Sequence, residues 1–251
     1  MPDAAVLAEM YGPAYRNQPG AEEAVADPKD PRRVLALLRQ RKPGTFVDYG
    51  CGSGDLLVEA RAAGWTVCGV EFASEVVGEV AGRTGCTVVG DVESLRRARA
   101  APADVVHLGD VIEHLTDPAR IVSELAELIR RDGLLIAQGP LEAGPCLFSR
   151  VIQEARRHRL STVREMAPYH VLQATVLGQN LFFQRCGLRT IEYRVSEVAW
   201  PAPDRWVTSM LARPRAMALY ALRKLSQVAS RLNSSRWGNR YFFVGTTSSA
   251  T

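Results

Sequence analysis

Three glycines at alternate positions follow a short apolar stretch, and they constrain this chain more than any other feature. Residues 46–57 read FVDYGCGSGDLL, which predicts a strand, a tight glycine turn and then a helix. Glycines at such a turn let a ligand approach the main chain closely. The dinucleotide fingerprint G-x-G-x-x-G would need glycine or alanine where Asp55 stands. Asp48 at the strand end instead favours a ligand that carries positive charge.

Composition and cysteine usage are those of an intracellular globular protein. The 251 residues are 47% hydrophobic and 23% charged, and no apolar run reaches the length of about 18 residues that a membrane-spanning helix needs. The first residues show no basic and apolar leader. Five cysteines are scattered without C-x-x-C spacing, which favours reduced, mostly buried thiols over disulfides or a zinc site. We therefore expect a cytoplasmic protein.

Apolar stretches alternate with helical patterns along most of the chain. Strands are predicted over 45–49, 66–71, 87–90, 103–108, 134–137, 188–195 and 241–246. Helices are predicted over 32–41, 55–63, 74–81, 118–131, 153–164 and 175–185. Continuous apolar strands that alternate with helices indicate a parallel sheet covered on both faces. The fold class predicted is α/β, a Rossmann-like, doubly wound sheet of seven strands.

A basic segment interrupts this pattern before the last strand. Residues 204–240 hold eight basic side chains and one acid, Asp204, and the apolar residues from Pro214 to Leu232 follow helical spacing. Three interpretations stay open: a helix that covers the sheet edge, contact with an anionic membrane or a phosphorylated or lipid-linked acceptor, and nucleic-acid binding. The sparse aromatic residues disfavour nucleic acid. We expect one domain over 1–251, made of an N-terminal cap (1–42), a cofactor-binding half (43–140), a substrate lid (141–175) and a basic helical insertion (204–238).

Characteristic motifs stand at the carboxyl ends of the first four predicted strands. They are the glycine segment with Asp48, then Glu71, then Asp91, and then the sequence DVIEHLTDP that begins at Asp110. In this order they closely resemble class I S-adenosylmethionine-dependent methyltransferases. Within that class the chain is similar to the small-molecule group that includes ubiquinone-pathway O-methyltransferases and natural-product methyltransferases. The resemblance covers about residues 42–139 and is weaker over 181–188.

The resemblance implies S-adenosylmethionine as cofactor and assigns a role to each motif. The glycine segment and Asp48 would surround the methionine part, and Glu71 would accept hydrogen bonds from both ribose hydroxyls. Phe72 would pack on the adenine, while Asp91 would accept from its exocyclic amine. The implied cofactor set is Asp48, Gly50, Cys51, Gly52, Gly54, Glu71, Phe72, Asp91, Val92, Gly109, Asp110 and Val111. The alternatives are helix caps or solvated turns for the acids, and a packing residue rather than a reactive thiol for Cys51.

Histidine is the natural base for removing a proton from an acceptor hydroxyl near neutral pH. Of the four histidines, His107 lies inside a predicted strand and is expected in the core, while His158 stands among arginines and is expected in solvent. His114 follows the fourth strand, and His170 lies in the expected lid. These two are the candidate catalytic residues. The alternatives are that His114 only shapes its turn and that His170 only packs the lid.

A divalent ion is a further implication of the resemblance. In ubiquinone-pathway enzymes a carboxylate-x-x-Glu-His arrangement is associated with such an ion, and Asp110, Glu113 and His114 match it here. They could hold Mg²⁺ in principle, although the first carboxylate is aspartate rather than glutamate. A metal is therefore possible but not favoured.

The expected function is methyl transfer to a small-molecule acceptor, at oxygen rather than nitrogen or carbon, in natural-product or sugar biosynthesis. One alternative is methylation of a lipid-linked or quinone-type precursor at a membrane surface. Another is a scaffold that binds the cofactor without turnover. A dehydrogenase is a more distant alternative, and it would require binding of NAD.

Overall fold

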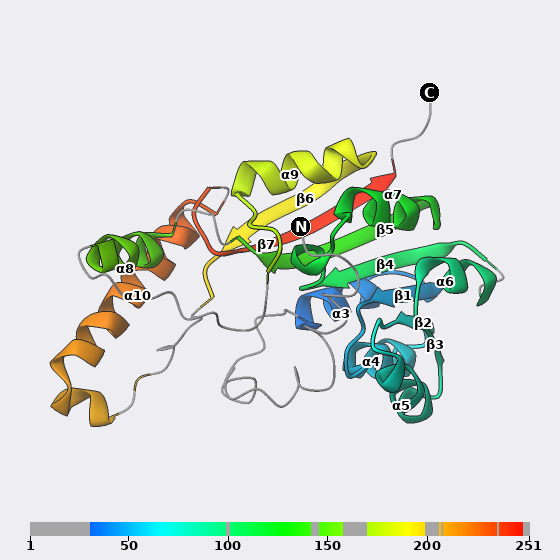
Figure 1. The fold of residues 1–251 in the computed structure, drawn as a ribbon, viewed down its shortest axis with the longest axis horizontal. Coiled ribbons are helices and arrows are strands. Elements are labelled where there is room, and N and C mark those ends of the chain that lie inside the picture. Colours follow the sequence, from blue (N-terminus) through cyan, green and yellow to red (C-terminus); the bar gives the residue numbers. More distant parts are fainter. Residues whose placement is uncertain are drawn as a thin grey trace.

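The computed structural model describes residues 31–98, 101–141, 146–157, 170–198, 206, 208–234 and 236–247. At its centre is a seven-stranded sheet with the order β3-β2-β1-β4-β5-β7-β6 (Figure 1). The strands are β1 (Thr45–Tyr49), β2 (Thr66–Val70), β3 (Thr87–Val89), β4 (Ala103–Gly109), β5 (Ile129–Pro140), β6 (Leu188–Ser196) and β7 (Arg240–Thr247). Strands β1 to β5 run parallel, whereas β7 is antiparallel to both β5 and β6. The predicted fold class is therefore confirmed.

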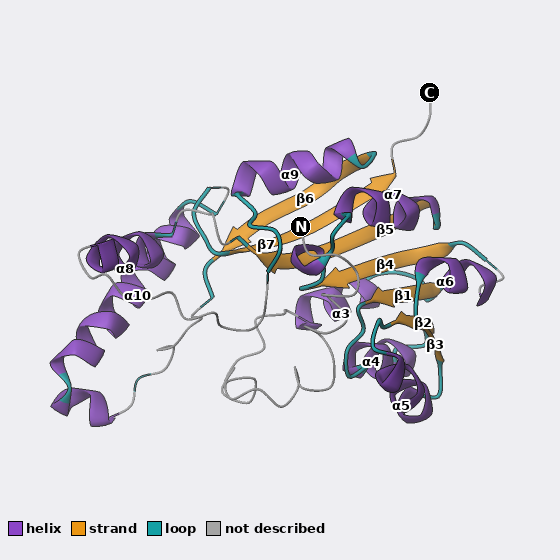
Figure 2. Cartoon of the chain, in the orientation of Figure 1, coloured by secondary structure: helices purple, strands orange, loops and turns teal. Residues whose placement is uncertain are grey.

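Helices cover both faces of this sheet (Figure 2). The helices of the structure are α3 (Pro31–Arg39), α4 (Asp55–Ala62), α5 (Ser74–Thr84), α6 (Val92–Ala98), α7 (Pro118–Glu127), α8 (Leu147–Arg157), α9 (Val176–Arg185) and α10 (Pro214–Leu232), with short 3₁₀ helices η1 (Ile112–His114) and η2 (Thr208–Ala212). Of these, α8 and α10 pack against each other at the end of the sheet instead of over a face. Buried residues of α3, α4 and α5 form one core cluster with the sheet, and those of α6, α7 and α9 form another. The change of face after α5 follows because parallel crossovers are right-handed and the chain reverses its direction across the sheet after β3.

The structure corrects one predicted boundary. The helix expected over 118–131 ends at Glu127. Arg130 and Arg131, expected in its last turn, and Gly133, expected to end it, lie in β5 instead. The chain leaves the helix because Ala103 N donates to Leu128 O at 2.8 Å and Ile129 pairs with Ala103 across the sheet. Arg130 also forms an ion pair with Asp104 at 2.6 Å. Sheet pairing therefore overrides the local helix signals.

Other differences concern the segments outside the first half of the sheet. The helix expected over 153–164 begins earlier, at Leu147, and residues 158–169, with His158, lie outside the described part of the chain. Residues 1–30 of the expected N-terminal cap, much of the expected lid and residues 199–205 also lie outside it. The helix α10 occupies the range where helical spacing was found. Among the described residues, no helix is both long enough and apolar enough to cross a membrane.

Candidate functional site

The glycine segment forms a tight loop between β1 and α4, at the carboxyl end of the sheet. Gly50, Gly52 and Gly54 all have positive φ, at 74°, 52° and 77°. A Cβ on Gly50 would lie 2.4 Å from Val111 Cγ2, whereas a Cβ on Gly52 would meet nothing within 4 Å. Gly50 is therefore required by packing as well as by backbone conformation. The open space at Gly52 is where a ligand could approach the main chain.

Glu71 joins this loop to the end of β2. Its Oε2 accepts a hydrogen bond from Gly52 N at 2.9 Å, and its Oε1 accepts one from Phe72 N at 2.9 Å. Phe72 is 53% exposed, and its ring meets Tyr49 edge-on at a centroid distance of 5.3 Å. An acceptor carboxylate thus stands beside an exposed aromatic ring. This pairing suits a ligand that carries hydroxyls next to a flat heterocycle.

Asp48 takes part in a buried polar chain across three strands. Its Oδ1 lies 2.7 Å from His107 Nδ1, and His107 Nε2 lies 3.2 Å from Gln138 Nε2. The side chains of Asp48 and His107 are 5% and 3% exposed. The expectation that His107 is a core residue is confirmed. Because Oδ1 is held by this imidazole, a ligand would meet Asp48 through its other oxygen or through water.

The surroundings of Asp91 and of Cys51 indicate a structural role for each side chain. Asp91 is exposed and accepts a hydrogen bond from Ser94 N at 2.6 Å, so it caps the start of α6, a helix that the sequence analysis did not predict. Cys51 is buried, and burial together with the charge of Asp48 raises the pKa of its thiol to about 12. The thiol is therefore protonated near neutral pH, which favours the packing interpretation. Capping leaves Asp91 exposed to solvent, where a ligand could still reach it.

A second group of polar side chains lies where β4 leads into η1. His114 in η1 contacts His170 at a ring-centroid distance of 4.9 Å and an interplanar angle of 69°. Val171 N and Leu172 N both donate to Glu113 O, at 2.9 and 3.2 Å, which ties the segment after His170 to η1. The structure thus brings together the two candidate catalytic histidines, although 56 residues separate them in the sequence.

Burial governs the ionisation of the groups around these histidines. Burial and the Asp110 carboxylate raise the pKa of Glu113 to about 8. Burial also raises the pKa of Tyr241 well above 10, and the Glu113 and Asp110 carboxylates add to this. Within the described residues, Glu113 Oε1, Asp110 Oδ2 and the Tyr241 hydroxyl are buried without a hydrogen-bond partner. Glu113 is therefore mostly neutral at pH 7.

Asp110, Glu113 and His114 are the metal-ligand set that the resemblance makes possible but does not favour. Asp110, whose φ is +54°, turns its carboxylate to Arg240, at 2.7 Å from Nη2. Glu113, His114 and His170 instead place one ligand atom each within 4.8 Å of one another. Mg²⁺ prefers an octahedron of oxygen ligands. Two imidazoles and one carboxyl do not fit that ion, so we derive no chemical step through Mg²⁺.

Several contributors to this region could not be recognised from the sequence. Gln138, Arg240 and Tyr241 lie on β5 and β7, and each contacts or faces a group on β4 or η1. In the sequence, Arg240 is recognised only as one of the eight basic side chains of residues 204–240. The signal that could have identified Arg240 is a cation at the start of a predicted strand that lies next to a buried acid. This signal can be used only when the order of the strands in the sheet is known.

Comparison with known proteins agrees with this geometry. A family model described as a methyltransferase domain matches residues 22–189. A ubiquinone biosynthesis O-methyltransferase of Actinobacillus pleuropneumoniae is 29% identical over 116 residues, 40% of this chain and 49% of that protein. A trans-aconitate 2-methyltransferase of Azoarcus is 32% identical over 117 residues, 43% and 44% of the two chains. The chain spans about half the length of the curated relatives it matches.

A solved structure extends the comparison beyond that half. Magnesium protoporphyrin IX methyltransferase from Synechocystis, solved with bound S-adenosylhomocysteine, superposes with a TM-score of 0.51 at 16% identity. The match covers 87% of this chain and 81% of that one. The match to the family model, the order of the strands and the glycine loop all indicate a methyltransferase domain. The chain therefore belongs to the family of methyltransferase domains, and its fold is that of class I S-adenosylmethionine-dependent methyltransferases.

Proposed function

We propose that this protein transfers the methyl group of S-adenosylmethionine to an oxygen of a small-molecule acceptor in natural-product or sugar biosynthesis. The observation that carries the proposal is the contact between the imidazoles of His114 and His170. His114 follows β4, at the same end of the sheet as the glycine loop. Ligands of doubly wound sheets bind at that end. The relatives named as a ubiquinone biosynthesis O-methyltransferase and a trans-aconitate 2-methyltransferase support a small-molecule acceptor.

The cofactor would lie across the glycine loop. The loop from Gly50 to Gly54 would surround the methionine part, and the main-chain amide of Gly52 would meet its carboxylate once Glu71 releases it. Asp48 would meet the ammonium. Glu71 would exchange its bond to Gly52 N for the ribose hydroxyls, and the exposed ring of Phe72 would pack on the adenine. Asp91 and the Val92 amide would bind the adenine edge, while the segment Gly109, Asp110 and Val111 would close the methionine side.

Methyl transfer from a sulfonium is an in-line displacement. The acceptor oxygen forms a bond to the methyl carbon as the carbon–sulfur bond breaks, and S-adenosylhomocysteine leaves with the electron pair. The protein mainly supplies alignment and exclusion of water. We infer that His114 or His170 takes the hydroxyl proton, because imidazole is the side chain best suited to general-base work near neutral pH. The main-chain carbonyl of Glu113 would hold the segment that begins at Val171, while its buried, neutral carboxyl would add no charge beside the histidines.

Variants of the two histidines test this assignment. We expect His114→Ala and His170→Ala, singly and together, to bind S-adenosylhomocysteine as the parent does, measured by calorimetry. Turnover of methyl-labelled S-adenosylmethionine with the acceptor should fall about 100-fold or more for at least one of them. Loss of cofactor affinity along with turnover would place the histidines in the cofactor site. Unchanged turnover in the double variant would overturn the proposal for the base.

A lipid-linked or quinone-type acceptor is a second candidate, and one observation favours it. Large apolar side chains of α10, among them Leu225 at 63% exposed, point to solvent beside basic residues. Partition of the labelled product decides between the two: label in the organic phase favours a lipid-like acceptor, and label in the aqueous phase favours a sugar or polar metabolite.

A further inference from the structure

The helix α10 buries polar side chains and exposes apolar ones, which is the reverse of an ordinary surface helix. Its polar residues Arg223, Ser226 and Ser230 are 1%, 0% and 2% exposed. Its apolar residues Leu225 and Val228, by contrast, are 63% and 50% exposed. A surface helix normally buries its apolar stripe and presents its polar face to water. The reversal needs a physical reason and leaves an apolar surface that must be accounted for.

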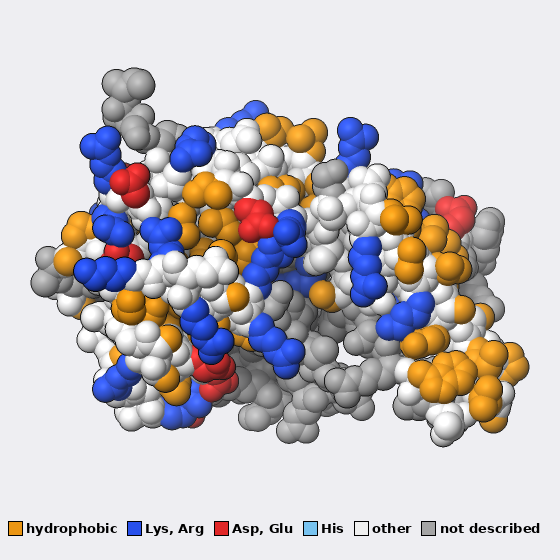
Figure 3. Space-filling view, turned by 180° about the vertical axis from the view of Figure 1, so that it is seen from behind, with side chains coloured by type: hydrophobic (Ala, Val, Ile, Leu, Met, Phe, Trp, Pro, Cys, Tyr) orange, Lys and Arg blue, Asp and Glu red, His pale blue; other side chains and the backbone are white. Residues whose placement is uncertain are grey.

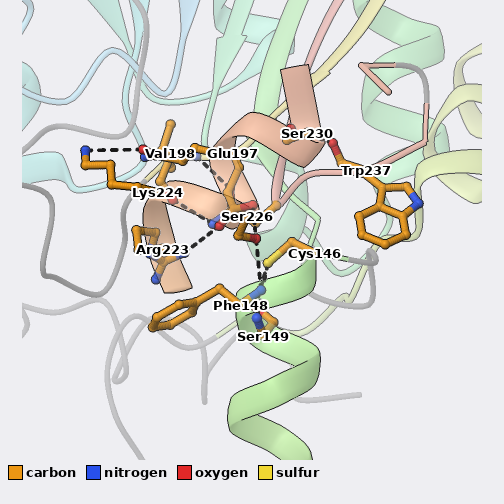
Figure 4. A network of polar contacts seen from close by, with 12 residues as sticks. Cys146, Phe148, Ser149, Glu197, Val198, Arg223, Lys224, Ser226, Ser230 and Trp237 are labelled. Atoms are coloured by element: carbon orange, nitrogen blue, oxygen red, sulfur yellow. Dashed lines mark hydrogen bonds and ion pairs between the residues drawn. The ribbon is translucent and has the colours of Figure 1, made fainter. Parts of the chain in front are cut away.

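Buried polar contacts hold the helix in this orientation (Figure 4). Arg223 Nη1 bonds Glu197 Oε1 at 2.9 Å, and its guanidinium lies 3.4 Å above the centre of the Phe148 ring. Ser226 Oγ donates to Glu197 Oε2 and accepts from Phe148 N at 2.9 Å. Rotating α10 to hide its apolar stripe would break this ion pair and leave buried charges unpaired, which is strongly unfavourable. The exposed stripe is thus fixed by the fold.

The apolar surface extends beyond the N-terminal end of α10. Trp206 and Leu211, next to the start of α10, are 48% and 66% exposed, and Trp206 contacts Tyr220 at a ring-centroid distance of 5.7 Å. Figure 3 shows hydrophobic side chains gathered at the lower right, the end of the molecule formed by η2 and the start of α10. We call this surface the α10 stripe; its members are Met217, Leu225, Val228 and Leu232, with Trp206 and Leu211 beside them.

The charges around the α10 stripe indicate what kind of partner can bind there. From residue 205 to residue 240 every charged side chain is basic. Lys224 and Arg231 border the stripe on the helix, and Arg213 and Arg215 are exposed at its start. A second copy of this chain would bring cations against cations with no acid on the segment to pair them. A surface that is apolar inside and anionic at its edge, such as a bilayer with acidic headgroups, matches both features.

We propose that the α10 stripe docks on an anionic lipid bilayer. The helix lies in the plane of the interface, with Leu225, Val228 and Leu232 in the acyl boundary and the bordering cations at headgroup phosphates. Charged residues recur along α10, so it lies on the membrane rather than across it. The proposal does not depend on methyl transfer.

Vesicle flotation of the full chain tests the proposal. The probes are vesicles of phosphatidylcholine with phosphatidylglycerol and vesicles of phosphatidylcholine alone. We expect the parent to float with the anionic vesicles only. The double variant Leu225→Gln, Val228→Gln should partition about tenfold more weakly or worse. Leu177→Gln on α9 removes a 68% exposed leucine away from α10 and should leave flotation unchanged.

Charge variants test the electrostatic part. Lys224→Gln with Arg231→Gln should lower partition roughly tenfold, and high salt should do the same. Arg223 is excluded from this pair because it is buried, so its removal would test packing instead. Thermal unfolding by circular dichroism checks that each variant stays folded, and the contrast between the two vesicle types needs no variant at all.

Three results would overturn the proposal. One is that the parent fails to float with anionic vesicles, and another is that the stripe variant floats as well as the parent. The third is a dimer, seen by light scattering, that the Leu225 and Val228 substitutions convert to a monomer, since a second copy would then cover the stripe.

Discussion

Replacing Glu113 with glutamine should make the stability of the protein less sensitive to alkaline pH. The pKa of this carboxyl rises from 4.5 to about 8 on folding, chiefly through burial and then through the Asp110 carboxylate. Below pH 4.5 both states hold the proton, so the group contributes no pH dependence. Between these two values the unfolded chain loses a proton that the folded chain keeps, and the free energy of unfolding falls as pH rises.

The shift sets the size of the effect. A change of about 3.5 pKa units corresponds to at most about 5 kcal/mol of stability lost between pH 4.5 and pH 8. Glutamine has nearly the same shape and no titration in this range, so Glu113→Gln should remove that part of the slope. The backbone contacts from Glu113 O to Val171 N and Leu172 N are unaffected by the substitution.

Urea denaturation of the parent and the variant, at about pH 5 and about pH 8.5, measures the effect. Subtracting the two proteins cancels the other titrating groups. We expect the variant to gain several kcal/mol on the parent between the two conditions. Curves that stay parallel across this range would show that Glu113 is ionised normally in the folded protein, and the reasoning from burial would be wrong.

Four further substitutions follow from the same structure. Glu71→Ala should weaken S-adenosylhomocysteine binding about tenfold or more in calorimetry, and unchanged affinity would refute the ribose assignment. In urea denaturation Gly52→Ala should cost about 1 kcal/mol for its positive φ, while Gly50→Ala should cost at least about 2 kcal/mol because it also strikes Val111; equal costs would contradict this. Phe183→Ala removes a buried ring stacked on Phe243 at 3.9 Å and should cost about 3–5 kcal/mol by the same measurement; a loss under 1 kcal/mol would contradict the packing.

Much of the cofactor half could be predicted because its signals are local. The strand from Thr45 to Tyr49 and the turn at Gly50 depend on neighbours in sequence, and both lie where expected. The boundary after Glu127 could not be predicted in this way. Arg130 and Gly133 are typical of a helix end, yet pairing with β4 draws them into a strand.

The surroundings of the candidate catalytic residues depend on distant partners. Neither the contact of His114 with His170 nor the pairing of Asp110 with Arg240 follows from spacing. The first depends on the bonds from Val171 N and Leu172 N to Glu113 O, and the second on the order of the strands. The buried face of α10 is a similar case. Periodicity predicts an amphipathic helix, but only the ion pair of Arg223 shows which side faces the protein.

Transfer of label from methyl-labelled S-adenosylmethionine tests the central claim most directly. The protein is incubated with an extract of small metabolites, and heat-inactivated protein and the Glu71→Ala variant serve as controls. We predict that label enters a discrete small-molecule product with the active parent and that both controls abolish or sharply reduce it. Binding of S-adenosylhomocysteine with no label in any product across varied extracts would contradict the proposed enzyme and favour a cofactor-binding scaffold.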